Sequence, residues 1–163
     1  MTGEERVIAL SSDFNEVTMS NTQVPPPTTP YGAPMTIADA RKAMAAAEAE
    51  AARNGWGMSI AIVDSGGNLL MLHRLDNAQL SSVRLAEAKA RTAVEFRRPT
   101  KLLEDAVGGG GIGLRVLTFG ACVADGGVPI TQDGKIVGGI GVSGAAGYQD
   151  GQVATAGAAA IRD

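Results

Sequence analysis

Four polar residues that could bind a ligand or transfer a proton lie together at His73, Arg74, Asp76 and Asn77. They follow Leu69–Leu72, an apolar run that predicts a buried strand. Arg74 and Asp76 are two positions apart, so in an extended chain their side chains leave the same face. The arginine could anchor a carboxylate and the aspartate could transfer a proton. The alternative is a solvated turn with a surface ion pair, which contributes little to stability.

His73 is the only histidine of the chain. One imidazole is sufficient as an axial ligand of haem iron, so His73 could hold that cofactor. The sequence alone favours the alternative, a strand-end histidine bonded to a nearby carboxylate such as Asp76. Other metal sites are not expected, because the sequence has no cysteine pair, no second histidine and no dense carboxylate cluster. The single cysteine, Cys122, lies in an apolar run and should behave as a small hydrophobe.

Lys89 lies in an alanine-rich stretch with helical periodicity. An amine buried against apolar walls has a depressed pKa and could act as a base or as a Schiff-base nucleophile. A solvated surface lysine is the alternative.

Two further patterns imitate known catalytic or binding motifs. Gly141–Ala145 is similar to a nucleophile elbow around Ser143, but a hydrolase would also need His73 as its base, and we interpret Ser143 as a turn residue. The run Gly108–Gly113 satisfies G-x-G-x-x-G. It follows a predicted helix, whereas a dinucleotide loop follows a strand, so we expect a flexible loop or a helix stop.

The elements that position these residues can be predicted from periodicity and turn chemistry. Thr36 and Asp39 predict the start of a helix, and Asn54-Gly55 predicts its end. Two hairpins are expected around Asp64–Asn68 and Gln132–Gly134. A further helix is expected in the run Leu80–Phe96, after a cap at Ser81 or Ser82. The other expected helices are Pro99–Val107 and Gln149–Ile161. The expected extended segments are Met58–Val63, Leu69–Leu72, Leu114–Val123, Val128–Ile130 and Ile136–Val142. Hairpins with helices packed on them indicate an α+β fold with an antiparallel sheet of about five strands.

The chain of 163 residues is long enough for one domain with a sizeable core. Residues 1–34 differ in composition, since Thr22–Pro34 is rich in proline, and we expect an extended arm, either disordered or draped over a neighbouring subunit. A short strand could form at Arg6–Leu10. The domain proper should then span residues 35–163.

Composition also excludes some classes of partner. The net charge is −3 and there is no basic block, so nucleic acid is not an expected partner. No segment approaches the length of a membrane span, and the N-terminus lacks the pattern of a signal peptide. We therefore expect a cytoplasmic protein without a membrane partner.

Five motifs in order resemble the GlcG/HbpS family of haem-binding proteins. They are Ala61–Leu69, Arg74–Ala78, Ala88–Ala93, Gly126–Ile130 and Gly138–Gly144. The resemblance covers about Thr36 to Ile161 and implies a profilin-like fold, homo-oligomers of up to eight subunits, and genes that often stand in catabolic clusters. The family's usual glycine is replaced here by Asn77, which tolerates the left-handed conformation better than most residues.

Two functions are compatible with these observations. The first is an oligomeric protein that binds haem or a related planar cofactor, with His73 as the metal ligand if haem is bound. The second is a small-molecule isomerase, lyase or hydratase that uses Asp76 and Lys89 for proton transfer and Arg74 as a carboxylate anchor. The residues expected to contact the ligand are Arg74, His73, Asn77, Arg97, Gly127, Val128 and Pro129. The aromatic content of 4% mildly disfavours haem, whereas the family resemblance favours it.

Overall fold

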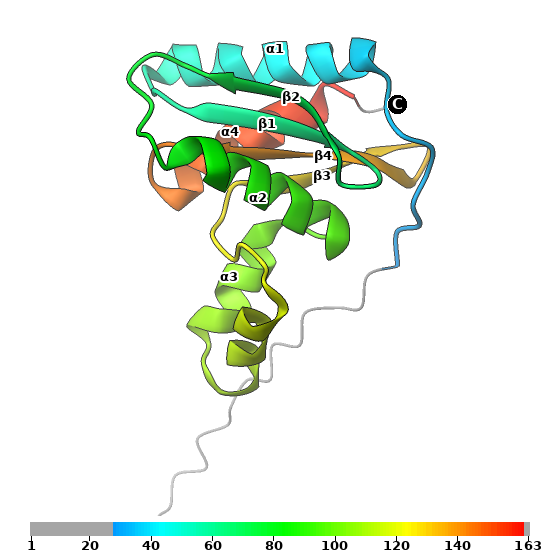
Figure 1. Ribbon diagram of the computed structural model, residues 1–163, viewed down its shortest axis with the longest axis vertical. Coiled ribbons are helices and arrows are strands. Elements are labelled where there is room, and N and C mark those ends of the chain that lie inside the picture. The colour runs from blue at the N-terminus through cyan, green and yellow to red at the C-terminus, as the bar shows by residue number, and fades with distance from the viewer. Residues whose placement is uncertain (1–27, 162–163) are drawn as a thin grey trace, which may run out of the picture.

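A computed structural model describes residues 28–161. Its single four-stranded antiparallel sheet has the order β2-β1-β4-β3, with β1 (Ser59–Asp64), β2 (Leu69–Arg74), β3 (Gly127–Gln132) and β4 (Lys135–Ser143). Figure 1 shows helix α1 (Ile37–Asn54) and helix α4 (Gly147–Ala159) on one side of the sheet and helix α2 (Ser82–Glu95) on the other. The expected α+β, profilin-like arrangement is confirmed, with four strands in this part of the chain rather than five.

Helix α1 begins and ends where its sequence predicts. The Thr36 hydroxyl accepts a hydrogen bond from the Asp39 N–H, and Gly55 closes the helix in the left-handed conformation with φ 69°. One stripe of the helix is buried against the sheet and α4, and consists of Ala40, Ala43, Met44, Ala47 and Ala51. This stripe joins Ile60, Ile62, Ile140 and Val142 in the larger of two hydrophobic clusters.

Helix α2 lies directly on the opposite face of β4. A Cβ atom at Gly141 would lie 2.0 Å from the carbonyl oxygen of Ala86, so only glycine allows this approach. The predicted hydroxyl cap of α2 is wrong, because Ser81 makes no capping hydrogen bond. The Ser82 hydroxyl donates instead to the Gln79 carbonyl, and its oxygen lies 2.8 Å from that of buried Ser59. Burial of this serine on the sheet takes it out of the capping position.

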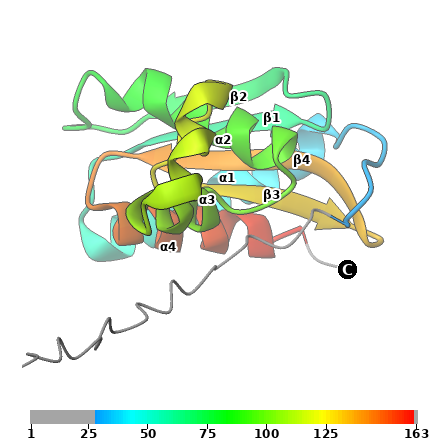
Figure 2. The same cartoon turned by 90° about the horizontal axis from the view of Figure 1, so that it is seen from below.

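Helix α3 (Thr100–Gly108) and the 3-10 helix η1 (Gly111–Phe119) form a projection below the sheet, which we call the α3–η1 arm (Figures 1 and 2). Pro99 caps α3, close to the predicted start. The expected extended segment Leu114–Val123 is wrong, because residues up to Phe119 are helical. Gly110 and Gly111, both with positive φ, turn the chain back along α3, where no strand is available for pairing. Cys122 beyond the arm is half-buried.

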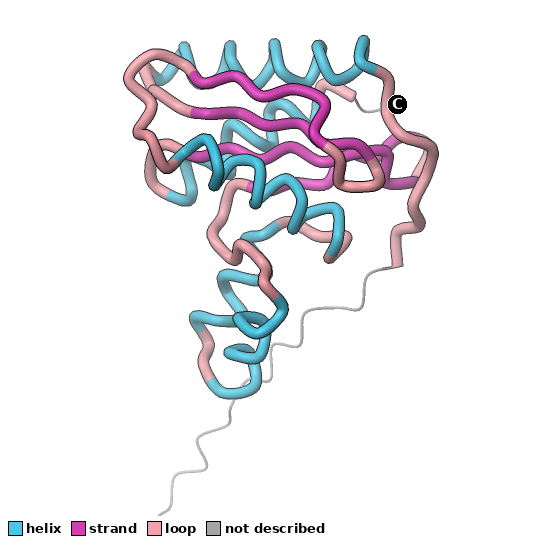
Figure 3. Tube along the Cα trace, in the orientation of Figure 1, coloured by secondary structure: helices cyan, strands magenta, loops and turns pink. Residues whose placement is uncertain are grey.

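Both hairpin turns form as predicted, as the tube in Figure 3 makes plain. Asp133 and Gly134 have φ values of 49° and 68°, which suits a type I′ turn.

The segment before α1 runs beside the start of β4, where Tyr31 forms a parallel bridge with Ile136. The predicted strand Arg6–Leu10 lies outside the described residues, and the domain boundary at residue 35 stays a prediction. No helix in residues 28–161 is long and apolar enough to cross a membrane.

Candidate functional site

The predicted polar cluster at the end of β2 is divided between the two faces of the sheet. His73 pairs with Ile60 and Arg74 with Ser59, so their side chains alternate. His73 lies on the α1 side, where its Nδ1 is 2.6 Å from Glu48 Oε1. Its side chain is 45% exposed. Because Ser143 pairs with Ser59, Ser143 and His73 also lie on opposite faces, and the hydrolase arrangement does not form.

Arg74 lies on the α2 side and folds onto the turn that follows it. Its Nε and Nη2 donate to the Ala78 carbonyl at 3.3 and 3.0 Å. Asn77 takes the left-handed conformation with φ 63°, the conformation expected of it. Asp76 is exposed, and its backbone carbonyl packs against Gly57. Arg74, Asp76 and Asn77 therefore belong to one short turn at the edge of the sheet.

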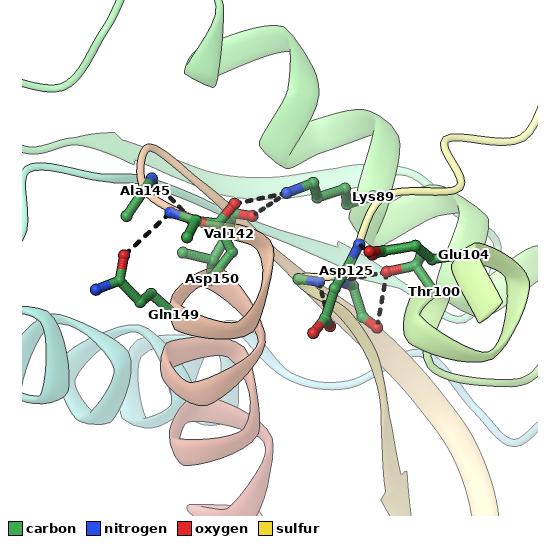
Figure 4. A network of polar contacts seen from close by, with 11 residues as sticks. Lys89, Thr100, Glu104, Asp125, Val142, Ala145, Gln149 and Asp150 are labelled. Carbon is green, nitrogen blue, oxygen red and sulfur yellow. Dashed lines mark hydrogen bonds and ion pairs between the residues drawn. The ribbon is translucent and has the colours of Figure 1, made fainter. Parts of the chain in front are cut away.

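Lys89 is buried in the middle of α2 and paired with an acid on another element. Its Nζ donates to Asp150 Oδ2 at 2.7 Å and to the Val142 carbonyl at 3.0 Å, and both side chains of the pair are 3% exposed (Figure 4). The other oxygen of Asp150 accepts the Ala145 N–H at 3.1 Å. Burial raises the pKa of Asp150, and the bonds from Lys89 oppose that effect. These contacts are those of an ammonium donor, and a role as base would require breaking them.

Two further acidic residues, Asp125 and Glu104, lie beside the buried ion pair. The Asp125 N–H donates to Glu104 Oε2 at 2.5 Å, and Asp125 Oδ1 accepts the Gly126 N–H at 2.7 Å. Burial raises the pKa of Asp125, and the negative charge of Glu104 raises it further. A Cβ atom at Gly126 would lie 3.0 Å from Lys89 Nζ, so the two groups of charges adjoin (Figure 4).

Gly127 is the predicted ligand residue that the fold brings to Lys89. A Cβ atom there would lie 2.4 Å from the Lys89 carbonyl oxygen, and the Gly127 N–H donates to Thr100 Oγ1 at 2.9 Å. Val128 and Pro129 continue along the edge strand β3, both half-buried. Arg97 lies at the far end of α2, where its guanidinium carbon is 4.5 Å from the centre of the Tyr31 ring. The predicted residues thus fall into three places: the β2 end, the Lys89 region and the Arg97 corner.

Sequence reasoning missed Glu48, Asp125 and Asp150 as partners of the predicted residues. Glu48 is 25 positions from His73, and Asp150 is 61 positions from Lys89, so no local spacing connects them. A weak signal existed for Asp150, since an acid in the first turn of a helix next to a glycine-rich strand can face that strand. In residues 28–161 no cluster of three or more histidine, cysteine or acidic side chains could hold a metal ion.

The residues around His73 are compatible with haem ligation. A metal-binding histidine usually commits one ring nitrogen to a carboxylate and leaves the other for the metal. Glu48 occupies Nδ1, which leaves Nε2 of a half-exposed ring without a protein partner in residues 28–161 and able to coordinate a metal. The donor set at this position fits an axial ligand.

Comparisons with known proteins identify the family of this chain. A family model described as haem degrading protein HbpS-like matches residues 35–159. Protein GlcG of Escherichia coli K12 is 42% identical over 100 residues, which cover 61% of this chain and 74% of that protein.

Two crystal structures are similar in fold. That of HbpS has a TM-score of 0.72 at 38% identity and covers 80% of this chain and 92% of its own. That of a PduOC–haem complex has a TM-score of 0.71 at 32% identity, covering 78% and 95%.

Proposed function

This chain belongs to the HbpS-like family, and from that premise we propose that it binds haem, with Nε2 of His73 as the iron ligand. The contact between His73 and Glu48 carries the proposal, because it fixes the ring and its tautomer as expected of a metal-binding histidine. A related structure of the same fold holds haem, which supports the choice of cofactor. Haem iron, when bound, supplies redox chemistry that no side chain of the chain provides.

Arg74 lies on the face of the sheet opposite to His73. It uses Nε and Nη2 for the Ala78 carbonyl, which leaves Nη1 for a propionate of a haem held by a neighbouring subunit. The left-handed Asn77 holds the turn that presents the arginine. Arg97 is already stacked on Tyr31 at the other end of α2, so a propionate contact there would belong to a second subunit.

A haemin titration followed by absorbance tests the proposal. Wild type should give a saturable Soret shift at one haem per chain. His73→Ala should abolish the shift, and Glu48→Gln should weaken affinity about 10–100-fold, as loss of an outer partner of a ligand does. Glu87→Gln, which removes an exposed contact to Arg91 on α2, is the matched control and should titrate as wild type. A shift that survives in His73→Ala would disprove the assignment of the ligand.

Assembly and location are parts of the same proposal. We propose a homo-oligomer of up to eight subunits in the cytoplasm, encoded in a catabolic gene cluster, without nucleic acid or membrane as partner. One curated relative, from Citrobacter freundii, is named for its place between two genes, dhaT and dhaS, which supports the cluster. Sedimentation velocity with and without haem tests the assembly, and a monomer in both states would contradict it.

The burial of Lys89 favours a second candidate, a small-molecule isomerase, lyase or hydratase. A buried amine beside two carboxyls of raised pKa is a common feature of catalytic sites. Asp76 would transfer a proton beside Arg74, which would hold a carboxylate, at the end of β2, and Lys89 would transfer a proton separately at its own place in the fold. Solvent deuterium uptake into a panel of small hydroxy- and keto-acids, read by NMR, tests this candidate. Uptake should be lost in Asp76→Asn and retained in Arg91→Met, and its absence in wild type would dismiss the candidate.

A further inference from the structure

The α3–η1 arm exposes an apolar surface that nothing in residues 28–161 covers. No residue of η1 is buried, although its sequence is mainly apolar. Ile112 is 69%, Leu117 53% and Phe119 59% exposed. The full apolar surface of the arm consists of Leu102, Ile112, Leu114, Leu117 and Phe119. Several large exposed apolar side chains gathered on one short segment often mark an interaction site.

The backbone conformation of η1 also indicates that the arm packs against a partner. η1 continues for nine residues as a 3-10 helix, whereas such helices rarely exceed about four residues because their hydrogen bonds are poorly aligned. Within residues 28–161, an aromatic contact joins Phe119 to Phe96 at the end of α2, with ring centres 6.3 Å apart. A segment with so little internal support gains stability when another apolar chain packs on it.

The distribution of charge along the sequence indicates which segment could cover the apolar surface of the arm. Residues 97–119 contain Arg97, Arg98, Lys101 and Arg115 against two acids, Glu104 and Asp105. Residues 1–27 contain Glu4, Glu5, Asp13 and Glu16 against Arg6 alone, so they carry the whole net charge of −3 of the chain. The same acidic segment includes the apolar run Val7-Ile8-Ala9-Leu10. The excess of positive charge comes from Arg97 and Arg98 at the base of the arm, since Lys101 and Arg115 within it are balanced by Glu104 and Asp105. An acidic segment with an apolar run therefore matches these arginines and the apolar surface beside them.

The described part of the chain begins next to the end of α2, where the arm starts. The Tyr31 hydroxyl donates to the Val94 and Glu95 carbonyls at 2.9 and 3.3 Å, immediately before Phe96. Figure 1 shows this start of the chain beside the end of α2, from which the arm descends. About 20 residues separate Leu10 from this point, and a chain of that length reaches about 25 Å on average. The arm helix η1 is only about 18 Å long at the 3-10 rise of about 2 Å per residue.

We propose that residues 4–10 of this chain dock on the apolar surface of its own α3–η1 arm. Val7, Ile8 and Leu10 cover the surface around Leu117 and Phe119, while Glu4 and Glu5 face the arginines at its base. Docking on the same chain requires no second subunit, because the end of the described chain lies within reach of the arm. The contact is independent of haem binding.

Disulfide trapping in the full-length chain tests the docking. The background is Cys122→Ser, which removes the only native thiol. The test pair adds Ile8→Cys and Leu117→Cys, and the control pair adds Ile8→Cys and Leu80→Cys. Leu80 is 80% exposed and precedes the opposite end of α2, so it is accessible but outside the proposed contact. Mild oxidation, non-reducing electrophoresis and peptide mass mapping measure the products.

The expected result is an intramolecular 8–117 disulfide that forms at least ten-fold faster than the 8–80 disulfide. Glu4→Lys with Glu5→Lys should slow the 8–117 reaction several-fold. Equal rates for the two pairs would show that the segment does not dock, and a covalent dimer as the main 8–117 product would assign the surface to a second copy. Either result overturns the proposal. All substituted positions in the two pairs are exposed or precede the described fold, so a folding failure does not confuse the comparison.

Discussion

Lys89 Nζ lies 2.7 Å from Asp150 Oδ2, and this contact joins α2 to α4 across the end of the sheet with both side chains 3% exposed. A charge pair at this depth offers little net stability, yet either charge left alone is costly. The pair also fixes the loop after β4, because Asp150 accepts the Ala145 N–H.

Removing only one of the two charges should therefore destabilise the protein strongly. Lys89→Met should lower the free energy of unfolding by about 3–5 kcal/mol, whereas Lys89→Met with Asp150→Leu should recover most of that loss. Urea denaturation of the two variants and wild type measures both values. A double variant as unstable as the single one would mean that the charges are not coupled.

The raised pKa of Asp125 predicts the direction of a pH effect. A carboxyl whose pKa is raised on folding favours the folded state at low pH, and that contribution is lost as the pH rises through the folded pKa. Asp125→Asn keeps an oxygen acceptor for the Gly126 N–H and removes the titration. The variant should gain stability relative to wild type as the pH rises above about 4, the ordinary range of an aspartate.

Asp39 provides a control for which the pH dependence of stability has the opposite sign. Its pKa is lowered by the side-chain hydrogen bond from Lys42 and by the contact with Thr36. Its stabilising contribution is present above the ordinary aspartate range and is lost as the pH falls through the folded pKa. Asp39→Asn should therefore lose stability relative to wild type as the pH rises. Denaturation midpoints measured from pH 3 to 8 give both trends. The same trend for both variants would contradict the opposite pKa shifts of Asp39 and Asp125.

The contact of α2 with β4 predicts that Gly141 cannot be replaced. Gly141→Ala places a methyl group 2.0 Å from the Ala86 carbonyl oxygen, so the helix must move away from the sheet. Overpacking of this kind costs about 1–3 kcal/mol or more. Gly108→Ala, where the added methyl group meets nothing within 4 Å, is the matched control and should be neutral or stabilising by up to about 1 kcal/mol. Thermal melts compare the two variants, and equal shifts would refute the close packing.

Asn77 should be replaceable by glycine but not by alanine. Its φ of 63° costs alanine about 1–2 kcal/mol, while glycine adopts this conformation freely. Asn77→Gly should stay within about 0.5 kcal/mol of wild type, and Asn77→Ala should be about 1 kcal/mol less stable. Chemical denaturation gives both values. If the alanine variant were as stable as wild type, the turn would not need the left-handed residue.

Features that depend on neighbouring residues could be predicted from the sequence. The Thr36 cap, the Gly55 stop and the Asp133-Gly134 turn each follow from side-chain chemistry within a few positions, and all three form. The Leu114–Val123 segment was mispredicted because its apolar composition suits a strand as well as an unpaired helix. A strand requires a neighbour, and local sequence cannot say whether one is available.

The candidate site also divides into features that local sequence predicts and features that need a distant partner. Burial of Lys89 was one of two readings that the helix pattern allowed, and the structure selects it. Its partner Asp150 and the His73 partner Glu48 come from other elements, so only the assembled fold brings them together. The separation of His73 from Arg74 follows from strand alternation, because adjacent residues of a strand point to opposite faces, and this part of the site could be predicted from the sequence.

The sheet order also determines when each strand can find its partner during synthesis. β1 pairs on one side with β2, its neighbour in sequence, and on the other with β4, where Ser59 meets Ser143. The first hairpin can form as it leaves the ribosome, with α1 already available to cover Ile60 and Ile62, but the other edge of β1 stays unpaired until β4 has been translated. A ribosome stalled before residue 135 would therefore hold a nascent chain with an open strand edge, the form most exposed to chaperones and to aggregation.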